Sequence, residues 1–246
     1  MVTKAELVAV SKKEGIPLGT VEKDYILTYT LKKIYNSDLK ESLVFKGGTA
    51  LHKLYLHKRI SVDLDFTSLR RIEPDDLKRV IEDKEIQSKI KDINDIGNST
   101  RVILGYVSAL EFANRIFLDI SKREKPVLSL ARKSIYSSFF EEFDVLTFEL
   151  DELLAEKIRA LNQRKKPRDY LDLYYIAESG KANFATAVEI AKKKLSAFKE
   201  EFDKKRILDD TELVQTLWEQ GLRGIFPSAP RFDEVMNKIR DVFAPL

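Results

Sequence analysis

The feature that most limits the fold is a pattern of apolar, glycine and acidic residues between Phe45 and Phe66. A short apolar run ends at Gly47-Gly48, a stretch with helical character follows over residues 49–56, and Asp63 and Asp65 then alternate with apolar neighbours. Such alternation is typical of a strand, in which residues i and i+2 point to the same face. The pattern predicts a strand, a tight turn, a short helix and a second strand.

The glycine turn, Lys46-Gly47-Gly48-Thr49, lies between the predicted strand and the predicted helix. Glycine permits positive φ and lets backbone amides approach a ligand closely. Unpaired N–H groups and the positive end of the helix dipole favour phosphate at such a place. The spacing is neither that of a Walker A loop nor that of G-x-G-x-x-G. The alternative interpretation is a tight strand–helix turn that binds nothing.

Two carboxylates on one strand face, among apolar residues, are unfavourable unless a cation pairs with them. Asp63 and Asp65 fit this description, and Mg²⁺ held by one or two carboxylates together with substrate phosphates would satisfy it. Asp119 lies in another apolar strand and would be a third carboxylate if the strands are neighbours. The alternatives are a solvated strand end, neutralisation of the pair by Arg59, and an ion pair of Asp119 with Lys122 or Arg123.

The character of the chain changes at residue 151, after which only helices are predicted. Lys157 and Arg164 are seven residues apart, hence on nearly the same helix face, and Asp169 and Asp172 share a face of the next helix. Six cations from Lys157 to Arg168 suit a triphosphate or an RNA backbone. The alternative is a solvated helix–loop–helix junction with i,i+4 ion pairs. For the run 192–194 a solvated helix face is the favoured interpretation.

Periodicity and turn residues give the remaining elements. We expect a mixed α/β half over residues 1–150 and a helical half over 151–246, which pack against each other and leave a cleft. Helices are predicted at 4–14, from an N-cap at Thr20 to 35, from Pro74 through Ile90, at 151–164, 168–178, from Phe184 through Phe202, near 210–220 and at 231–243. Strands are predicted at 43–45, 61–66, 99–107, 114–121 and 143–150.

Composition excludes several classes of protein. The chain of 246 residues has no cysteine, so disulfides, thiolate metal sites and cysteine nucleophiles are excluded. The formal net charge is only +3, which does not by itself indicate a nucleic-acid binder. Neither a long apolar run nor a signal-peptide core is present, so we expect a cytoplasmic protein without membrane contact.

These motifs, in this order, resemble the AbiEii/AbiGii-type nucleotidyltransferase toxins of the DNA polymerase β-like superfamily, whose hallmark is a G-[GS] turn followed by D-x-[DE]. Residues 45–51 and 59–66 resemble the first motif of that family. Residues 22–25, 118–120, 157–164 and 168–174 are similar to further family positions. The resemblance spans about residues 20–178.

The resemblance implies an α+β protein: a nucleotidyltransferase-fold mixed sheet with flanking helices, followed by an all-helical C-terminal domain. It implies transfer of a nucleotide from an NTP, with one or two Mg²⁺ ions, to RNA such as the 3′ end of tRNA. The enzyme would be the toxin of a type IV toxin–antitoxin or abortive-infection pair, with a cognate antitoxin as partner; a monomer is favoured. The alternatives are an NTP-binding interaction module without catalysis and a transferase that modifies protein side chains.

Carried over by position, the resemblance also implies roles for individual residues. The expected metal ligands are Asp63, Asp65 and Asp119; the expected catalytic residues are Asp63, Lys157, Asp169 and Ser61; and the expected substrate-binding residues are Gly47, Gly48, Thr49, Lys46, Arg59, Arg164, Arg168 and Asp172.

Overall fold

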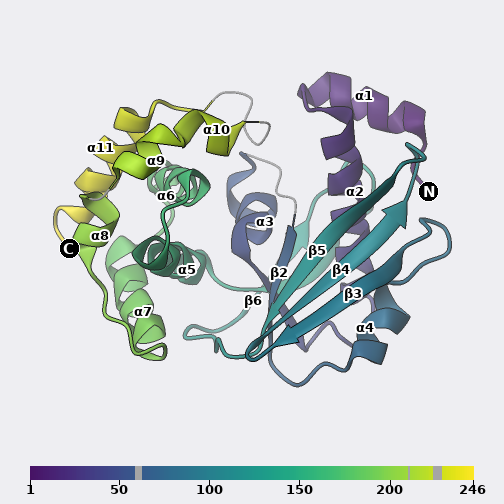
Figure 1. The fold of residues 1–246 in the computed structure, drawn as a ribbon, viewed down its shortest axis with the longest axis horizontal. Coiled ribbons are helices and arrows are strands. Elements are labelled where there is room, and N and C mark those ends of the chain that lie inside the picture. The colour runs from purple at the N-terminus through teal and green to yellow at the C-terminus, as the bar shows by residue number, and fades with distance from the viewer. Residues whose placement is uncertain (59–62, 210, 224–228) are drawn as a thin grey trace. The chain divides into compact units, whose positions relative to one another are not determined.

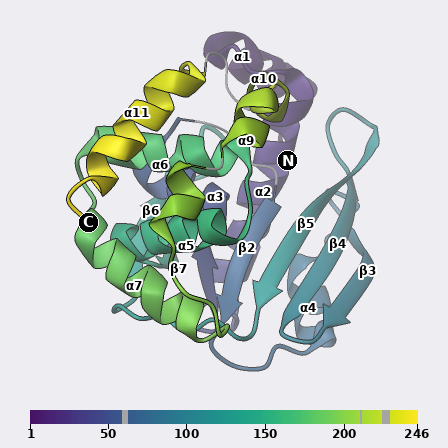
Figure 2. The ribbon, with the colours of Figure 1, turned by 60° about the vertical axis from the view of Figure 1, so that its left-hand side comes forward.

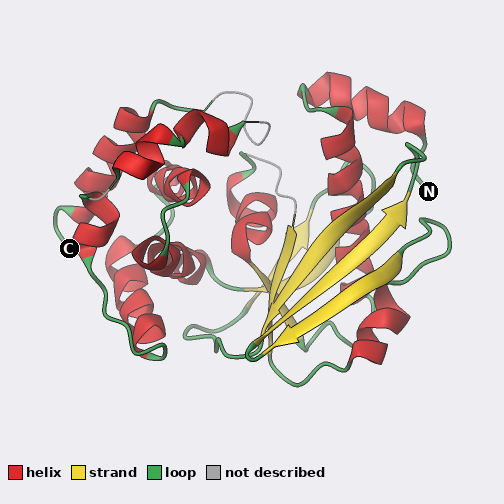
Figure 3. Cartoon of the chain, in the orientation of Figure 1, coloured by secondary structure: helices red, strands yellow, loops and turns green. Residues whose placement is uncertain are grey.

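The chain forms two compact units in the computed structural model, which describes residues 1–58, 63–209, 211–223 and 229–246. Unit 1 contains Met1–Leu54, Ile60–Lys125 and Leu130–Phe148, and unit 2 contains Tyr55–Arg59, Pro126–Ser129 and Glu149–Leu246. Within the described residues every named strand belongs to unit 1, while unit 2 consists of helices and loops (Figure 3). The described helices include none that is long and apolar enough to cross a membrane.

Unit 1 is built on a mixed sheet of seven strands in the order β3-β4-β5-β2-β1-β7-β6. Figure 1 shows the part of this sheet formed by β3, β4, β5 and β2. β2 is antiparallel to β1 and parallel to β5, and β1 is parallel to β7. The predicted α+β class with a mixed sheet is confirmed. The strands are β1 (Leu43–Lys46), β2 (Asp63–Ser68), β3 (Lys89–Ile96), β4 (Ser99–Val107), β5 (Ala113–Ser121), β6 (Ala131–Ile135) and β7 (Phe143–Thr147).

Two helices at the N-terminus precede the sheet. α1 (Lys4–Glu14) begins with a capping box between Thr3 and Glu6. α2 (Leu18–Tyr35) begins directly after Pro17, so the predicted N-cap at Thr20 is wrong: the fixed φ of proline already suits a helix start. At its other end the Tyr35 hydroxyl donates to the carbonyls of Leu43 and Leu146, at 2.8 and 2.9 Å, and so fastens α2 to β1 and β7.

The core at the centre of the sheet is aromatic. Phe45 of β1 and Phe66 of β2 are Cα partners, both fully buried, with ring centroids 5.7 Å apart. Burial of two such side chains contributes about 1.5–3 kcal/mol each. Because side chains alternate along a strand, burying Phe66 and Leu64 on this face leaves Asp63 and Asp65 on the opposite face.

In unit 1 two strands were not predicted, and one predicted helix is shorter than expected. α4 (Pro74–Ile81) ends before residue 90, because Asp83 and Ser88 form a bridge that leads into β3. β3 is a largely exposed edge strand whose charged residues conceal its alternation. β6 is the other edge strand and carries a polar middle, Arg132-Lys133-Ser134.

Unit 2 begins with α5 (Leu150–Gln163) and α6 (Pro167–Ser179), as predicted. α7 (Phe184–Ser196) lies beside α5 (Figure 2). It ends before Phe198 and Phe202, so the predicted continuous helix through Phe202 is wrong. Lys199 has a φ of 60°, a backbone conformation that a helix cannot contain. The remaining helices are α8 (Lys204–Leu208), α9 (Glu212–Thr216), α10 (Trp218–Leu222) and α11 (Phe232–Phe243).

Candidate active site

A row of charged residues crosses four neighbouring strands of unit 1. The register places Arg101 of β4 opposite Asp119 of β5, Asp119 opposite Asp65 of β2, and Asp65 opposite Lys46 of β1. Cα partners in adjacent strands direct their side chains to the same face of a sheet. The same face carries Asp63, two residues before Asp65. The structure thus brings the three predicted acids together on one face, between two cations.

Gly47 makes room for the second of these acids. It has a φ of +73°, and a Cβ on this residue would lie 2.1 Å from Oδ2, 2.6 Å from Cγ and 2.7 Å from Cβ of Asp65. A position with positive φ and no space for a side chain requires glycine on both counts. The glycine turn and the second aspartate of the D-x-D pattern are therefore packed directly against each other.

The helix after the turn starts two residues earlier than predicted. α3 (Gly47–Leu51) continues into a π-helical turn, His52–Leu56. Thr49 is buried, and its hydroxyl donates to the backbone carbonyl of Asp63 at 2.5 Å. This bond ties the first helical turn to the start of β2, so that the glycine turn and the acidic strand are held at two points, Gly47 against Asp65 and Thr49 against Asp63.

Asp119 forms a bidentate ion pair with Arg101. Arg101 Nε lies 2.7 Å from Oδ1 of Asp119, and a terminal nitrogen of the same guanidinium lies 2.8 Å from Oδ2. The hydrogen bonds and charge of Asp119, with smaller effects of Asp63 and Asp65, raise the pKa of Arg101 above its ordinary value. The expected alternative partner Lys122 pairs with Asp95 instead.

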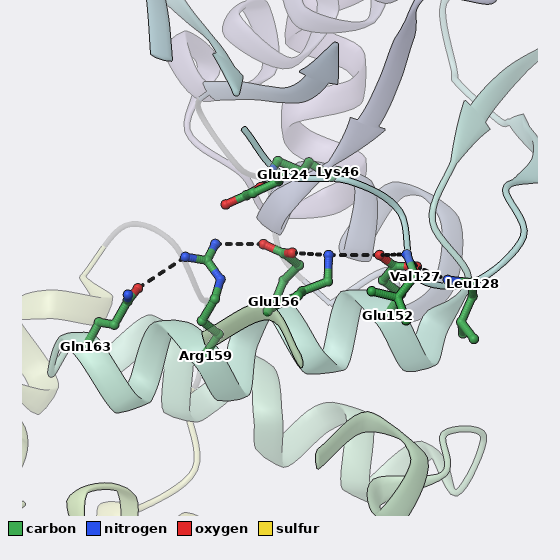
Figure 4. A network of polar contacts seen from close by, with 9 residues as sticks. Lys46, Glu124, Val127, Leu128, Glu152, Glu156, Arg159 and Gln163 are labelled. Carbon is green, nitrogen blue, oxygen red and sulfur yellow. Dashed lines mark hydrogen bonds and ion pairs between the residues drawn. The ribbon is translucent and has the colours of Figure 1, made fainter. Parts of the chain in front are cut away.

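Lys46, at the other end of the row, is buried and paired with Glu124. Figure 4 shows the two side chains next to each other. Both outer cations of the row thus have an acidic partner within unit 1.

In unit 2 the predicted cluster is an ion-pair network between α5 and α6. The Lys157 ammonium lies 3.0 Å from a carboxylate oxygen of Asp169 and 2.6 Å from one of Asp172, and Arg164 Nε lies 2.9 Å from the other oxygen of Asp169. Both aspartates are fully buried. Burial would raise the pKa of Asp169, but the charges of Lys157 and Arg164 outweigh it and hold this pKa below its ordinary value.

The cations of this region differ in accessibility. The side chain of Lys157 is 11% exposed, whereas that of Arg164 is 47% exposed. Arg168 is half-buried, and no ion pair is found for it within the described part of the chain. The predicted residues Arg59 and Ser61 lie outside the described residues.

A second buried network of unit 2 was not anticipated. Lys194 of α7 was expected on a solvated face, yet it is buried, with its ammonium 2.8 Å from Glu152 and 2.6 Å from Glu156. Glu152 also accepts the backbone N–H groups of Val127 and Leu128, so this carboxylate holds the segment 126–129 against α5 (Figure 4).

The chain was compared with known proteins. Its residues 29–238 match the family described as "Nucleotidyl transferase AbiEii toxin, Type IV TA system". No curated protein matches it. Among solved structures it resembles the MenT4 nucleotidyltransferase toxin of Mycobacterium tuberculosis H37Rv, with a TM-score of 0.77 and 15% identity over 99% of this chain and 89% of that one. It also resembles JHP933 of Helicobacter pylori, with a TM-score of 0.61 and 18% identity over 92% and 91%.

The family match covers well over half of the chain and includes both the glycine turn with its acidic strand and the Lys157–Asp169 cluster. The structural similarities, at low identity, independently support the nucleotidyltransferase fold. The chain is a nucleotidyltransferase and belongs to the AbiEii toxin family of type IV toxin–antitoxin systems.

Proposed function

We propose that this enzyme transfers a nucleotide from an NTP to an RNA acceptor such as tRNA, in a reaction that depends on Mg²⁺ and on Asp63 and Asp65. The observation that carries the proposal is the contact between Gly47 and Asp65, because it joins the turn that suits phosphate to the strand that suits a metal.

The residues of this face fit a magnesium ion. Mg²⁺ prefers hard oxygen ligands and is held in phosphoryl-transfer enzymes by one or two carboxylates together with substrate phosphates. Asp63 and Asp65 supply two carboxylates on one strand face, and both are half-buried rather than enclosed. The described residues contain no group of three or more acidic, histidine or cysteine side chains placed to hold a metal, so the substrate phosphates would complete the coordination.

The reaction would be an in-line displacement. A hydroxyl of the acceptor loses its proton to solvent and attacks the α-phosphorus of the NTP; a new P–O bond forms, the bond from that phosphorus to the oxygen bridging the β-phosphate breaks, and pyrophosphate leaves. Bound Mg²⁺ would supply charge neutralisation on the phosphates and a lower pKa for the attacking hydroxyl. The backbone amides of Gly47, Gly48 and Thr49 would orient the phosphates. A role of Arg164 and Lys157 in stabilising charge on the triphosphate is proposed on the family resemblance alone.

The other predicted residues would act indirectly. Asp169 and Asp172 hold the ammonium of Lys157 in place, and Lys46 is held by Glu124 beside the glycine turn. Arg168 is a candidate contact for the acceptor backbone. Ser61 and Arg59 belong to the same motif and are proposed for catalysis and substrate binding, respectively, on the resemblance alone.

The test is incubation of the full chain with each labelled NTP, Mg²⁺ and total tRNA, with Asp63→Asn as the inactive control. We expect label on RNA with at least one NTP, dependence on Mg²⁺, and loss of at least 100-fold in rate for Asp63→Asn, of the order found when one charge-stabilising group is removed. Label on the protein instead would indicate a side-chain acceptor. Normal NTP binding without transfer to either acceptor would refute the proposal.

The biological context has its own test. As a type IV toxin, the enzyme is expected to have a cognate antitoxin. Expression of the parent chain should arrest growth, expression of Asp63→Asn should not, and co-expression of the cognate antitoxin should restore growth. Equal arrest by both proteins would separate toxicity from nucleotide transfer.

A further inference from the structure

We propose that the half-buried ring of Phe117, on β5, is a stacking platform for the last nucleobase of a single-stranded RNA acceptor, and that Arg115 and Lys91 bind phosphates of the same strand. This inference rests on the proposed function and adds to it the place and the mode of acceptor binding. Phe117 would be a binding residue and not a catalytic one, because a stacked base holds the strand and takes no part in the bond changes.

The first evidence is the position of Phe117 relative to the acids. In the parallel ladder of β2 and β5 its Cα partner is Asp63. Cα partners in adjacent strands direct their side chains to the same face of the sheet, and adjacent strands are about 5 Å apart. A base stacked on this ring would therefore lie next to the first acid of the D-x-D pattern.

The second evidence is the side from which an acceptor has to arrive. In an in-line displacement the attacking and leaving oxygens lie on opposite sides of the reacting phosphorus. The glycine turn, proposed to hold the phosphates, follows β1 on one side of β2 and contacts Asp65 through Gly47. Phe117 belongs to β5, on the other side of β2. The acceptor hydroxyl is thus expected from the side on which Phe117 lies.

The third evidence is that this face of β4 and β5 is accessible. The neighbours of Phe117 along β5, Ile116 and Leu118, are fully buried on the face against which α2 and α4 pack (Figure 1). Phe117 and Ile103, its Cα partner on β4, are half-buried on the opposite face. On β3 the same row continues with the exposed acid Asp92. The apolar platform is therefore confined to β4 and β5 and suits a single base.

The fourth evidence is a pair of cations on the side of Phe117 away from Asp119. Arg115 is exposed, and the described part of the chain contains no ion pair for it or for the exposed Lys91. The Cα partner of Arg115 on β4 is Gly105, where a Cβ would lie 2.6 Å from Cε of Lys91. The missing side chain of Gly105 lets Lys91 lie across β4 on the face that carries Arg115. Both cations suit the phosphates of a strand whose end points to the acids.

The contacts of the ring in the free enzyme are weaker than a stacked base. The guanidinium groups of Arg115 and Arg101 lie over the ring of Phe117, 5.6 and 5.7 Å from its centroid. A cation over a ring at an exposed site changes an equilibrium about two- to fivefold, whereas a base stacked on a ring changes it about five- to 150-fold. Because Arg101 also pairs with Asp119, Arg115 is the group expected to leave the ring and turn to a phosphate.

The test is the affinity of the full chain for a short, labelled, single-stranded oligo(A) RNA, measured by fluorescence anisotropy without NTP. A second strand of the same length lacks only the base of its 3′-terminal nucleotide. The parent should bind the abasic strand about five- to 150-fold more weakly than the complete one. Phe117→Leu should bind the complete strand as weakly as the parent binds the abasic one, and should not distinguish the two strands. Phe117→Trp, which keeps an aromatic face, should bind as the parent does.

Tyr136→Leu is the matched control, because Tyr136 is an exposed aromatic residue that follows β6, at the other edge of the sheet. It should bind both strands as the parent does. Arg115→Gln should weaken binding of both strands alike and lower the salt dependence by about one phosphate contact. The affinity of Phe117→Leu for each NTP should stay within about twofold of the parent.

Two results would overturn the inference. One is equal affinity of the parent for the complete and the abasic strand, which needs no variant. The other is a loss of NTP affinity in Phe117→Leu with parental RNA affinity, which would assign the ring to the base of the NTP. Either result, with transfer of label to RNA by the parent, leaves the proposed function standing. Discrimination between the strands that depends on Phe117, without transfer to RNA under any NTP, would support the binding site and refute the proposed reaction.

Discussion

Substitution of Gly47 by alanine tests the central contact of the site. Two effects add. An alanine forced into a left-handed backbone conformation loses about 1–2 kcal/mol, and Gly47 has a φ of +73°. The new methyl group would also lie 2.7 Å from the Cβ of Asp65, an atom whose position is set by the β2 backbone. A change of rotamer at Asp65 cannot relieve this contact, so β1 and β2 must move apart.

Overpacking of this kind costs about 1–3 kcal/mol. The expected loss of unfolding free energy for Gly47→Ala is therefore about 2–5 kcal/mol, the sum of the two effects. Gly15→Ala isolates the first effect, because Gly15 has a φ of +65° in the same unit but has nothing within 4 Å of its Cβ position. It should lose only about 1–2 kcal/mol.

The assay is urea unfolding monitored by far-ultraviolet circular dichroism, together with a measurement of Mn²⁺ affinity in the absence of urea. Gly47→Ala should weaken Mn²⁺ binding as well as stability, because the displaced carboxylate is a proposed ligand. Gly15→Ala should leave Mn²⁺ binding unchanged. Equal losses of stability in the two variants, with parental Mn²⁺ affinity in both, would refute the argument that close packing against Asp65 requires glycine at position 47.

The ion-pair networks of unit 2 give further predictions. Lys157→Met leaves buried acids without their ammonium and should cost about 3–5 kcal/mol of unfolding free energy in urea titration; a loss below 1 kcal/mol would contradict the pairing. Lys194→Met should cost a similar amount for the same reason, whereas Lys192→Met, at an exposed pair, should cost at most about 1 kcal/mol. The pKa of Asp169 is lower in the folded chain than its ordinary value of 3.8. The ionised carboxylate therefore stabilises the fold fully above pH 3.8, and this contribution is lost as the pH falls through the pKa of the folded state. Thermal melting between pH 2 and 6 should show this loss below about pH 4, and a melting temperature independent of pH there would contradict it.

The sequence predicted the elements whose patterns are strong. The turn and strands of residues 43–66, the strands 99–107 and 114–121, and the first helices of unit 2 have regular periodicity and clear ends, and they are confirmed within the described residues. The edge strands β3 and β6 escaped prediction because exposed edges carry charged residues that hide alternation.

The ionic partners of the site were predictable to different extents. The predicted strands 99–107 and 114–121 come within one residue of the observed register: counted outward from their loop, Arg101 would lie opposite Ile120, whereas β5 begins at Ala113 and Arg101 lies opposite Asp119. The pair of Lys46 with Glu124, and that of Lys194 with Glu152, join residues far apart in the chain. No local pattern determines such a pair, because it depends on how strands and helices pack in three dimensions.

The buried cluster between α5 and α6 also limits what its cations can do for a nucleotide. The charge of Lys157 is balanced by two fully buried carboxylates, so its ammonium is first of all a structural group. Arg164 shares only one of these acids and is nearly half exposed, which leaves part of its guanidinium open to solvent. If both residues stabilise the triphosphate, their substitutions should have different effects: Arg164→Gln should raise KM for NTP while the chain stays folded, since the buried carboxylate of Asp169 keeps its ion pair with Lys157. Loss of Lys157 should unfold the cluster first, so that stability and nucleotide affinity fall together. Arg164 is therefore the residue at which nucleotide binding can be examined apart from folding.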